Sequence, residues 1–137
     1  MGKFILAAAL LWGLVPAPAA NAKTMGAEKR GIAVYYNPGV MERVAANRGL
    51  RKPAIADGMA SVPDCSQIGK IAFASVNGGL VERYFIVDCS APRDVARHLQ
   101  MGLVLEVDYQ SAVRHNFHRN GSAPAVVYSI GGSYVPR

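Results

Sequence analysis

Short runs of apolar and β-branched residues, each ended by a turn signal, recur along the chain. They predict six strands, at residues 31–36, 58–62, 70–76, 80–88, 103–107 and 125–130. Asn77-Gly78 lies between the third and fourth strands and is a strong signal for a β-hairpin. The run at 103–107 is almost continuously apolar, which is typical of a buried strand.

Three short helical patterns separate these strands. Apolar residues recur at three- and four-residue spacing over 40–45, and residues 93–101 have a helical pattern too. Asp108 is placed to cap a helix over 109–117, with Gly121 beyond its end. Six strands with short helices between them, in a chain of this size, predict a small closed β-barrel, because closure removes exposed sheet edges.

The first 22 residues have the pattern of a secretory signal peptide. Lys3 precedes an apolar run at 4–15, and Ala20-Asn21-Ala22 fits the small-residue cleavage rule. The apolar run is shorter than the roughly 20 residues that cross a bilayer. We therefore expect a secreted or periplasmic protein with no membrane span after cleavage. The remainder suits one domain, with a lead at 23–30, a barrel at 31–131 and a tail at 132–137.

The net charge of the chain indicates which kinds of partner it can bind. Fifteen Lys and Arg residues against nine Asp and Glu give a net charge of +6, which suits an anionic partner such as a cell-wall polysaccharide. The arginines form no run, so a plainly solvated surface is the alternative. Export argues against nucleic acid. His115 and His118 have no Cys or Glu nearby to complete a metal shell, so we predict no metal site and no cofactor.

Two short sequences carry the candidate chemistry: Asp64-Cys65-Ser66 is echoed by Asp88-Cys89-Ser90. Two cysteines in an oxidising compartment predict a Cys65–Cys89 disulfide. Such a bridge holds its two Cα atoms within about 5 to 7 Å and draws Asp64 and Asp88 into one neighbourhood. Paired carboxylates can divide the acid and base roles in cleaving a glycosidic bond. The alternative is structural: Asp88 orients a loop and Asp64 starts a turn.

Other side chains are candidates for ligand contacts. Tyr36 and Tyr84 can offer stacking surfaces to sugar rings, although aromatic residues in strands also serve as core. Arg43, with Arg48 and Arg51, lies around the first predicted helix and can meet an anionic ligand. A solvated helix face is the alternative for these arginines.

Several of these segments, in their order and spacing, resemble the double-psi β-barrel of the rare lipoprotein A family and its relatives. They are Ala33-Val34-Tyr35-Tyr36, Ile68-Gly69-Lys70, Asn77-Gly78, Ile86-Val87-Asp88 and Leu105-Glu106-Val107-Asp108-Tyr109-Gln110-Ser111-Ala112. The resemblance covers most of residues 31–130. It implies a mainly β fold, a six-stranded double-psi β-barrel with two or three short helices. More distant relatives with this barrel are barwin, expansins and some endoglucanases, which bind or act on polysaccharide.

The resemblance also implies roles for some residues. Asp88 matches the aspartate of the family's Asn-Asp-Arg-Gly-Pro motif, a catalytic acid or base in lytic transglycosylases of this type. Here Val87 and Cys89 replace its neighbours, and residues 60–62 stand where the family has its catalytic histidine. Asp64 is our own candidate for the missing second group. We therefore expect a barrel that binds cell-wall polysaccharide such as peptidoglycan, with weak or absent cleavage. The alternative is a non-catalytic barwin-like module that binds or inhibits a protein partner.

Overall fold

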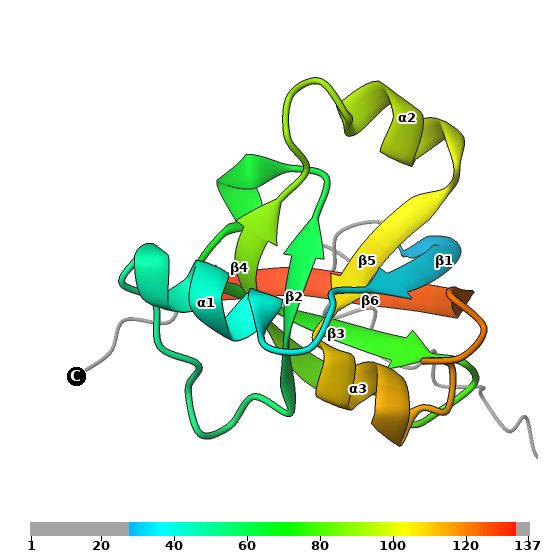
Figure 1. The fold of residues 1–137 in the computed structure, drawn as a ribbon, viewed down its shortest axis with the longest axis horizontal. Helices are drawn as coiled ribbons and strands as arrows, with labels where there is room; N and C mark the ends of the chain where they lie inside the picture. Colours follow the sequence, from blue (N-terminus) through cyan, green and yellow to red (C-terminus); the bar gives the residue numbers. More distant parts are fainter. Residues whose placement is uncertain (1–27, 134–137) are drawn as a thin grey trace, which may run out of the picture.

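Six strands form a closed barrel in the computed structural model, which describes residues 28–133 (Figure 1). The strands are β1 (Lys29–Tyr35), β2 (Gly58–Val62), β3 (Lys70–Val76), β4 (Glu82–Cys89), β5 (Leu103–Val107) and β6 (Ala123–Ser133). The helices are α1 (Val40–Asn47), α2 (Val95–Gln100) and α3 (Tyr109–Arg114), with a 3-10 turn, η1 (Cys65–Gln67). The predicted mainly β fold of six strands and three short helices is confirmed. The predicted signal peptide lies outside the described residues.

The barrel mixes parallel and antiparallel pairs. Its strand order is β1-β5-β2-β4-β3-β6; β1/β5 and β2/β4 are parallel, and β1/β6, β2/β5, β3/β4 and β3/β6 are antiparallel. The antiparallel pair β3/β4 is the predicted hairpin. Its turn contains Asn77 at φ 52° and Gly78 at φ 72°, a left-handed geometry that these two residue types adopt most readily.

The barrel interior is filled by apolar side chains from several strands. Ile86, Leu105 and Val107 are fully buried there, together with Phe117 from the segment after α3. Ala60 is the Cα partner of both Ile86 and Val107. The small side chain of Ala60 therefore separates two large ones at the centre of the barrel.

A second apolar cluster lies outside the barrel and holds α1 in place. Met41 and Ala45 on α1 pack against Phe85 and Val87, with Met59 of β2 in the same cluster. β4 is thus covered on both faces, which explains its almost continuous apolar run. This packing fixes α1, and the residues that follow it, against the outer face of β2 and β4.

The elements differ from the sequence-based ones at their ends. α3 begins as predicted, with Asp108 as its cap, but it ends at Arg114 rather than at 117. Asn116 has φ 57°, which is incompatible with a continued right-handed helix. The turn it makes sends Phe117 back into the core. β6 is longer than predicted and extends from Ala123 to Ser133.

The predicted disulfide is confirmed. Cys65 and Cys89 are bonded with their Cα atoms 4.9 Å apart, and the described residues contain no free cysteine. The bridge joins η1 to the end of β4. It therefore anchors the loop that follows β2 at the place where β4 leaves the barrel.

The connection between β4 and β5 projects from the barrel and carries α2 at its tip (Figure 1). None of the residues of α2 is buried. No helix within residues 28–133 has the length and apolar character needed to cross a membrane.

Ile86→Ala is expected to lower the free energy of unfolding by about 2 to 4 kcal/mol, because the change leaves a cavity in a closed interior. Urea denaturation followed by circular dichroism measures it. Ile55→Ala is the matched control: Ile55 is 57% exposed, so its truncation should change stability by about 0.5 kcal/mol or less. Equal losses at the two positions would contradict the barrel core.

Candidate functional site

Three polar side chains lie in a row across the outer face of the barrel. β2 lies between β4 and β5, and its Ser61 is the Cα partner of both Asp88 on β4 and Glu106 on β5. Paired residues on neighbouring strands point to the same side of a sheet. Asp88, Ser61 and Glu106 therefore lie side by side, and we call them the acidic row.

A β-bulge decides which way Asp88 points. Ala60 pairs with Ile86, but the next residue, Ser61, pairs with Asp88, so β4 has Val87 as an extra residue here. Ala60 and Ile86 are inside the barrel, and plain alternation along β4 would turn Asp88 inward as well. The extra residue shifts the alternation by one position and brings Asp88 to the outer face with Ser61.

Asp88 is held by two donors from the chain around α1. The Tyr36 hydroxyl donates to Asp88 Oδ2 over 2.8 Å, and the Arg48 guanidinium donates to Oδ1 over 2.8 Å. Burial raises the pKa of Tyr36, and its hydrogen bond to Asp88 raises that pKa further; the phenol stays a donor. The side chains of Arg48 and Asp88 are 43% and 16% exposed. A ligand at the surface can therefore reach the carboxylate.

Glu106 is the second acid of the row and is placed differently. It is half-buried, and no hydrogen bond or ion pair joins its carboxylate to another residue of the described chain. Burial raises the pKa of Glu106; the charge of His98 opposes this shift, and those of Asp88 and Asp94 add to it. Glu106 therefore keeps its proton to a higher pH than an ordinary glutamate.

Sequence reasoning did not single out Glu106. One signal was available: Glu106 is the only charged residue in the run Leu103–Val107. Val104 and Glu106 alternate with the three buried residues of β5. The alternation alone therefore predicts that the Glu106 carboxylate lies on the outer face. The proximity of Glu106 to Asp88 cannot be predicted in this way, because it depends on which strands lie next to each other.

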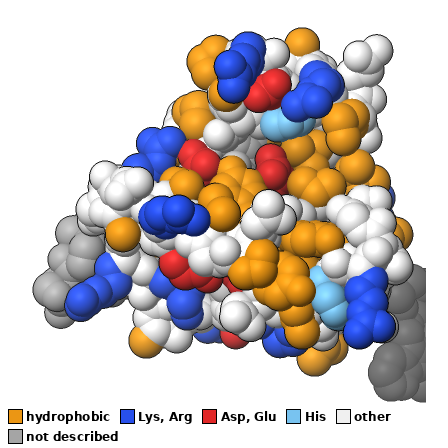
Figure 2. All heavy atoms as spheres, in the orientation of Figure 1, with side chains coloured by type: hydrophobic (Ala, Val, Ile, Leu, Met, Phe, Trp, Pro, Cys, Tyr) orange, Lys and Arg blue, Asp and Glu red, His pale blue; other side chains and the backbone are white. Residues whose placement is uncertain are grey.

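The α2 connection brings further polar groups toward the row. Ser90 Oγ lies 2.7 Å from His98 Nδ1, and Arg97 pairs with Asp94 over 3.2 Å. Figure 2 shows acidic side chains near the centre of this face, below a projecting part on which Lys, Arg and His side chains gather. Such a mixture of donors and acceptors suits a ligand whose hydroxyl groups both donate and accept hydrogen bonds.

Asp64 lies in a setting of its own. Its Oδ1 accepts a hydrogen bond from the Ser66 backbone N–H over 2.9 Å, which caps η1. The backbone and hydroxyl of Ser66, with Gln67, hold the pKa of Asp64 below its usual value. Within residues 28–133, no polar contact joins Asp64 to Asp88. The disulfide brings the cysteines together, while the two carboxylates have separate partners.

The other predicted ligand contacts are divided. Tyr36 belongs to the site through its bond to Asp88. Tyr84 is fully buried in the barrel interior, where its ring serves as core and is closed to a ligand at the surface. Arg43 is exposed on α1, and the arginine that reaches Asp88 is Arg48, which follows the helix.

A separate pocket of about 860 Å³ lies between α2 and the end of the barrel. Asp64 and Cys65 are in its lining, but no member of the acidic row is. Its walls are largely apolar and include Leu99, Leu103 and Ile130. We place the candidate site at the acidic row, because there the groups that can bind hydroxyls or transfer protons lie together.

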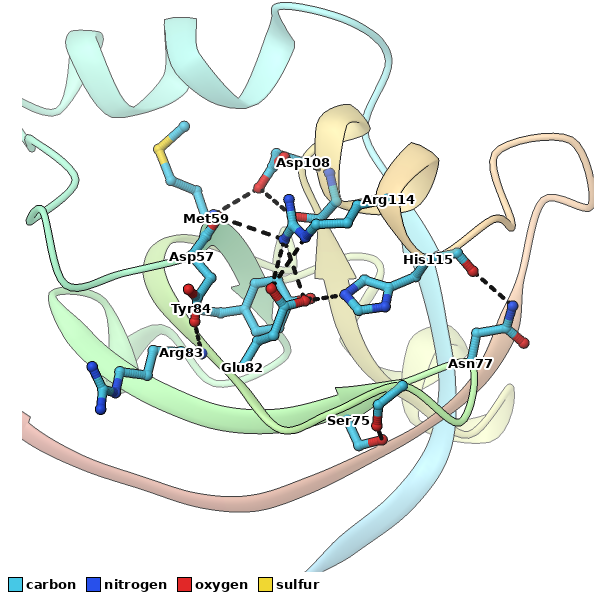
Figure 3. A network of polar contacts seen from close by, with 12 residues as sticks. Asp57, Met59, Ser75, Asn77, Glu82, Arg83, Tyr84, Asp108, Arg114 and His115 are labelled. Atoms are coloured by element: carbon cyan, nitrogen blue, oxygen red, sulfur yellow. Dashed lines mark hydrogen bonds and ion pairs between the residues drawn. The ribbon is translucent and has the colours of Figure 1, made fainter.

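A second polar network lies at the opposite end of β4 (Figure 3). Glu82 contacts both Arg114 and His115 at the end of α3, and Asn77 Nδ2 donates to the His115 carbonyl over 2.8 Å. These bonds tie the β3–β4 hairpin to α3 and are structural. No group of three or more His, Cys, Asp and Glu side chains in the described residues is placed to hold a metal ion.

Comparison with known proteins identifies the class of fold. The chain is similar to two solved structures of an expansin from Clavibacter michiganensis, one the apo protein and the other a mutant in complex with cellohexaose. Each is 13% identical, with a TM-score of 0.50 over 80% of this chain. The match covers 53% of each expansin chain, so this chain spans about half of their length. No protein-family model and no curated protein matches the sequence.

At this identity the likeness establishes the fold alone. The closed six-stranded barrel and its expansin neighbours confirm the predicted double-psi β-barrel. The closer resemblance to the rare lipoprotein A family stays a prediction.

Proposed function

We propose that the acidic row is a binding site for a cell-wall polysaccharide such as peptidoglycan. The observation that carries the proposal is the position of Asp88: a bulge turns its carboxylate onto the outer face, and Tyr36 and Arg48 fix it there while leaving it partly accessible. Rigidly placed, accessible charged groups bind sugar hydroxyls through charge-assisted hydrogen bonds. The expansin neighbour with cellohexaose supports a glycan on this type of barrel.

Asp88→Asn is expected to weaken binding to insoluble glycan by about tenfold or more, because it removes a charged acceptor worth roughly 1.5 to 3 kcal/mol. Pull-down titrations on peptidoglycan and on cellulose measure the affinity, and thermal melting measures the fold. Asp57→Asn is the matched control, since Asp57 also accepts a hydrogen bond, from the Arg83 backbone N–H, and is exposed outside the row. Unchanged affinity with a lowered melting temperature would make Asp88 a structural residue and defeat the proposal.

The same substitution at Asp64 tests the predicted pairing of the two aspartates. If only Asp88 contacts the glycan, Asp64→Asn should bind like the wild type. If Asp64→Asn and Asp88→Asn both weaken binding, Asp64 also contacts the bound glycan.

A protein-binding module is the second candidate function. Its support is an exposed apolar group near the β3–β4 hairpin: Leu80, Val81 and Phe73 are exposed, and Val81 and Phe73 line a shallow depression with Tyr128. Exposed apolar groups of this kind occur at protein interfaces. Two results together would favour this function. The protein would bind neither peptidoglycan nor cellulose, and it would retain a protein partner whose binding Val81→Ser abolishes.

A further inference from the structure

Glu106 is a charged residue that the fold does not need. It is half-buried on the outer face of β5, and no hydrogen bond or ion pair within residues 28–133 holds its carboxylate. Burying a carboxylate without a partner costs stability, and an apolar or neutral residue of similar size would avoid the cost. Unfavourable titratable groups of this kind concentrate at functional sites.

The position of Glu106 relative to Asp88 suits a two-carboxylate mechanism. Both are Cα partners of Ser61 and lie on the same face, with β2 between their strands. Two strand spacings put their Cα atoms about 9.5 Å apart. Glycosidases that use one carboxyl group as acid and the other to activate water leave room for that water molecule between the two groups, and here a whole strand separates the two acids.

The two acids have opposite surroundings, and these assign their roles. Asp88 accepts hydrogen bonds on both oxygens, one from the Arg48 cation, so it is bound as an ionised carboxylate. Glu106 has no such donor, and burial raises its pKa. The charged groups around Glu106 are Asp88 on β4 and His98 and Asp94 on and before α2. A pair of carboxyl groups with environments this different divides into an acid and a base.

We infer that Glu106 and Asp88 form an acid–base pair that hydrolyses a glycosidic bond in the polysaccharide bound at the acidic row. This inference rests on the binding function proposed above. Glu106 donates its proton to the glycosidic oxygen as the bond from that oxygen to the anomeric carbon breaks, and the bonding electron pair stays on the oxygen. Asp88 takes a proton from a water molecule whose oxygen forms the new bond to the anomeric carbon. One water is consumed, and the proton on Asp88 returns to Glu106 through solvent.

This mechanism has a defined pH dependence and stereochemistry. Only protonated Glu106 can donate, so the rate should fall as pH rises through its raised pKa. Water attacks from the side opposite the leaving oxygen, and the first product should have the inverted anomeric configuration.

The test measures binding and turnover on the same samples, with cellohexaose, chitohexaose and solubilised peptidoglycan strands as probes. Wild-type protein should release reducing ends from the probe that it binds. Glu106→Gln should lower the rate by about 100-fold or more and change the dissociation constant by about twofold or less, because the amide keeps the shape of the site. Glu42→Gln, which removes an exposed carboxylate on α1, should retain the wild-type rate.

Each other outcome overturns the inference. Binding without turnover on every probe would remove hydrolysis and leave the binding function intact, whereas binding to no probe would remove both. Wild-type rates in Glu106→Gln, or a product with retained configuration, would exclude Glu106 as the proton donor. Thermal melting of Glu106→Gln separates these results from misfolding, since the variant loses only a half-buried carboxyl group that makes no hydrogen bond and should melt no lower than the wild type.

Discussion

Asp108→Ala should lower the free energy of unfolding by about 3 to 5 kcal/mol, because it leaves buried backbone donors without partners. Asp108 is 5% exposed. Its Oδ2 accepts the Met59 N–H over 2.7 Å and the Ser111 hydroxyl over 3.0 Å, and its Oδ1 accepts the Ser111 N–H over 2.9 Å. The carboxylate thus caps α3 and also binds the backbone of β2. Urea denaturation of the purified protein measures the loss.

Two further variants sharpen this prediction. Asp108→Asn keeps the shape but has one acceptor oxygen where Asp108 uses two, so its loss should lie between those of the wild type and Asp108→Ala. Asp57→Ala is the matched control, since Asp57 is exposed and accepts one bond from the Arg83 N–H, and should cost about 1 kcal/mol or less. A small loss in Asp108→Ala, similar to that of Asp57→Ala, would contradict a buried bridge between α3 and β2.

The bridge matters for the acidic row because it joins the two strands that carry two of its members. Asp108 directly follows β5, which carries Glu106, and it binds Met59, two residues before Ser61 on β2. Gly58 makes room for it: a Cβ atom there would lie 2.7 Å from Asp108 Oδ2 and 2.4 Å from Ser111 Oγ. The buried carboxylate of Asp108 therefore fixes the position of Ser61 relative to Glu106.

Features set by local chemistry could be predicted from the sequence. The Asn77-Gly78 turn depends on two residues that adopt positive φ, and the cap of α3 depends on one side chain three residues from its donor. The six strands follow from runs of apolar residues. The disulfide could be predicted from the expected oxidising compartment and the presence of two cysteines. Each of these requires only short-range information or composition.

The site depended on long-range geometry that the sequence does not display. The bulge after Ala60 arises from the parallel pairing of β2 with β4, whose paired residues are more than 20 positions apart along the chain. That bulge sends Asp88 away from the barrel interior and toward Tyr36 and Arg48. The nearness of Glu106 to Asp88 depends in turn on β2 lying between β4 and β5. The sequence therefore predicts Asp88 beside Asp64, through the neighbouring cysteines, and gives no sign that Glu106 lies near Asp88.

The role of Tyr84 was also undecided by the sequence, because alternation in β4 is masked by burial on both faces. Tyr84 lies inside the barrel with Ile86, while Phe85 and Val87 pack outside beneath α1. Arg83, just before Tyr84, is exposed, but Phe85 on the same face as Arg83 is buried. The packing of α1 over Phe85 therefore hides the alternation from Tyr84 onward.

Removal of the disulfide should also cost much stability. The double variant Cys65→Ala with Cys89→Ala should have a free energy of unfolding about 3 to 4 kcal/mol lower than the wild type. The reason is that the bridge closes a loop of sequence separation 24 in the unfolded chain. The matched control is the wild-type protein with its bridge reduced, which has the same sequence and should show the same loss. Guanidinium denaturation with and without reductant measures both.

The double variant also separates the two interpretations of the aspartates. Without the bridge, η1 and Asp64 lose their link to β4, whereas Asp88 keeps its bonds to Tyr36 and Arg48. The end of β4 is also held by the Ser90 N–H, which donates to the Val62 carbonyl over 3.1 Å. Glycan affinity of the folded fraction should therefore change by about twofold or less. A loss of affinity comparable to that of Asp88→Asn would show that the glycan site needs the disulfide. It would then support a site that includes Asp64 beside the acidic row.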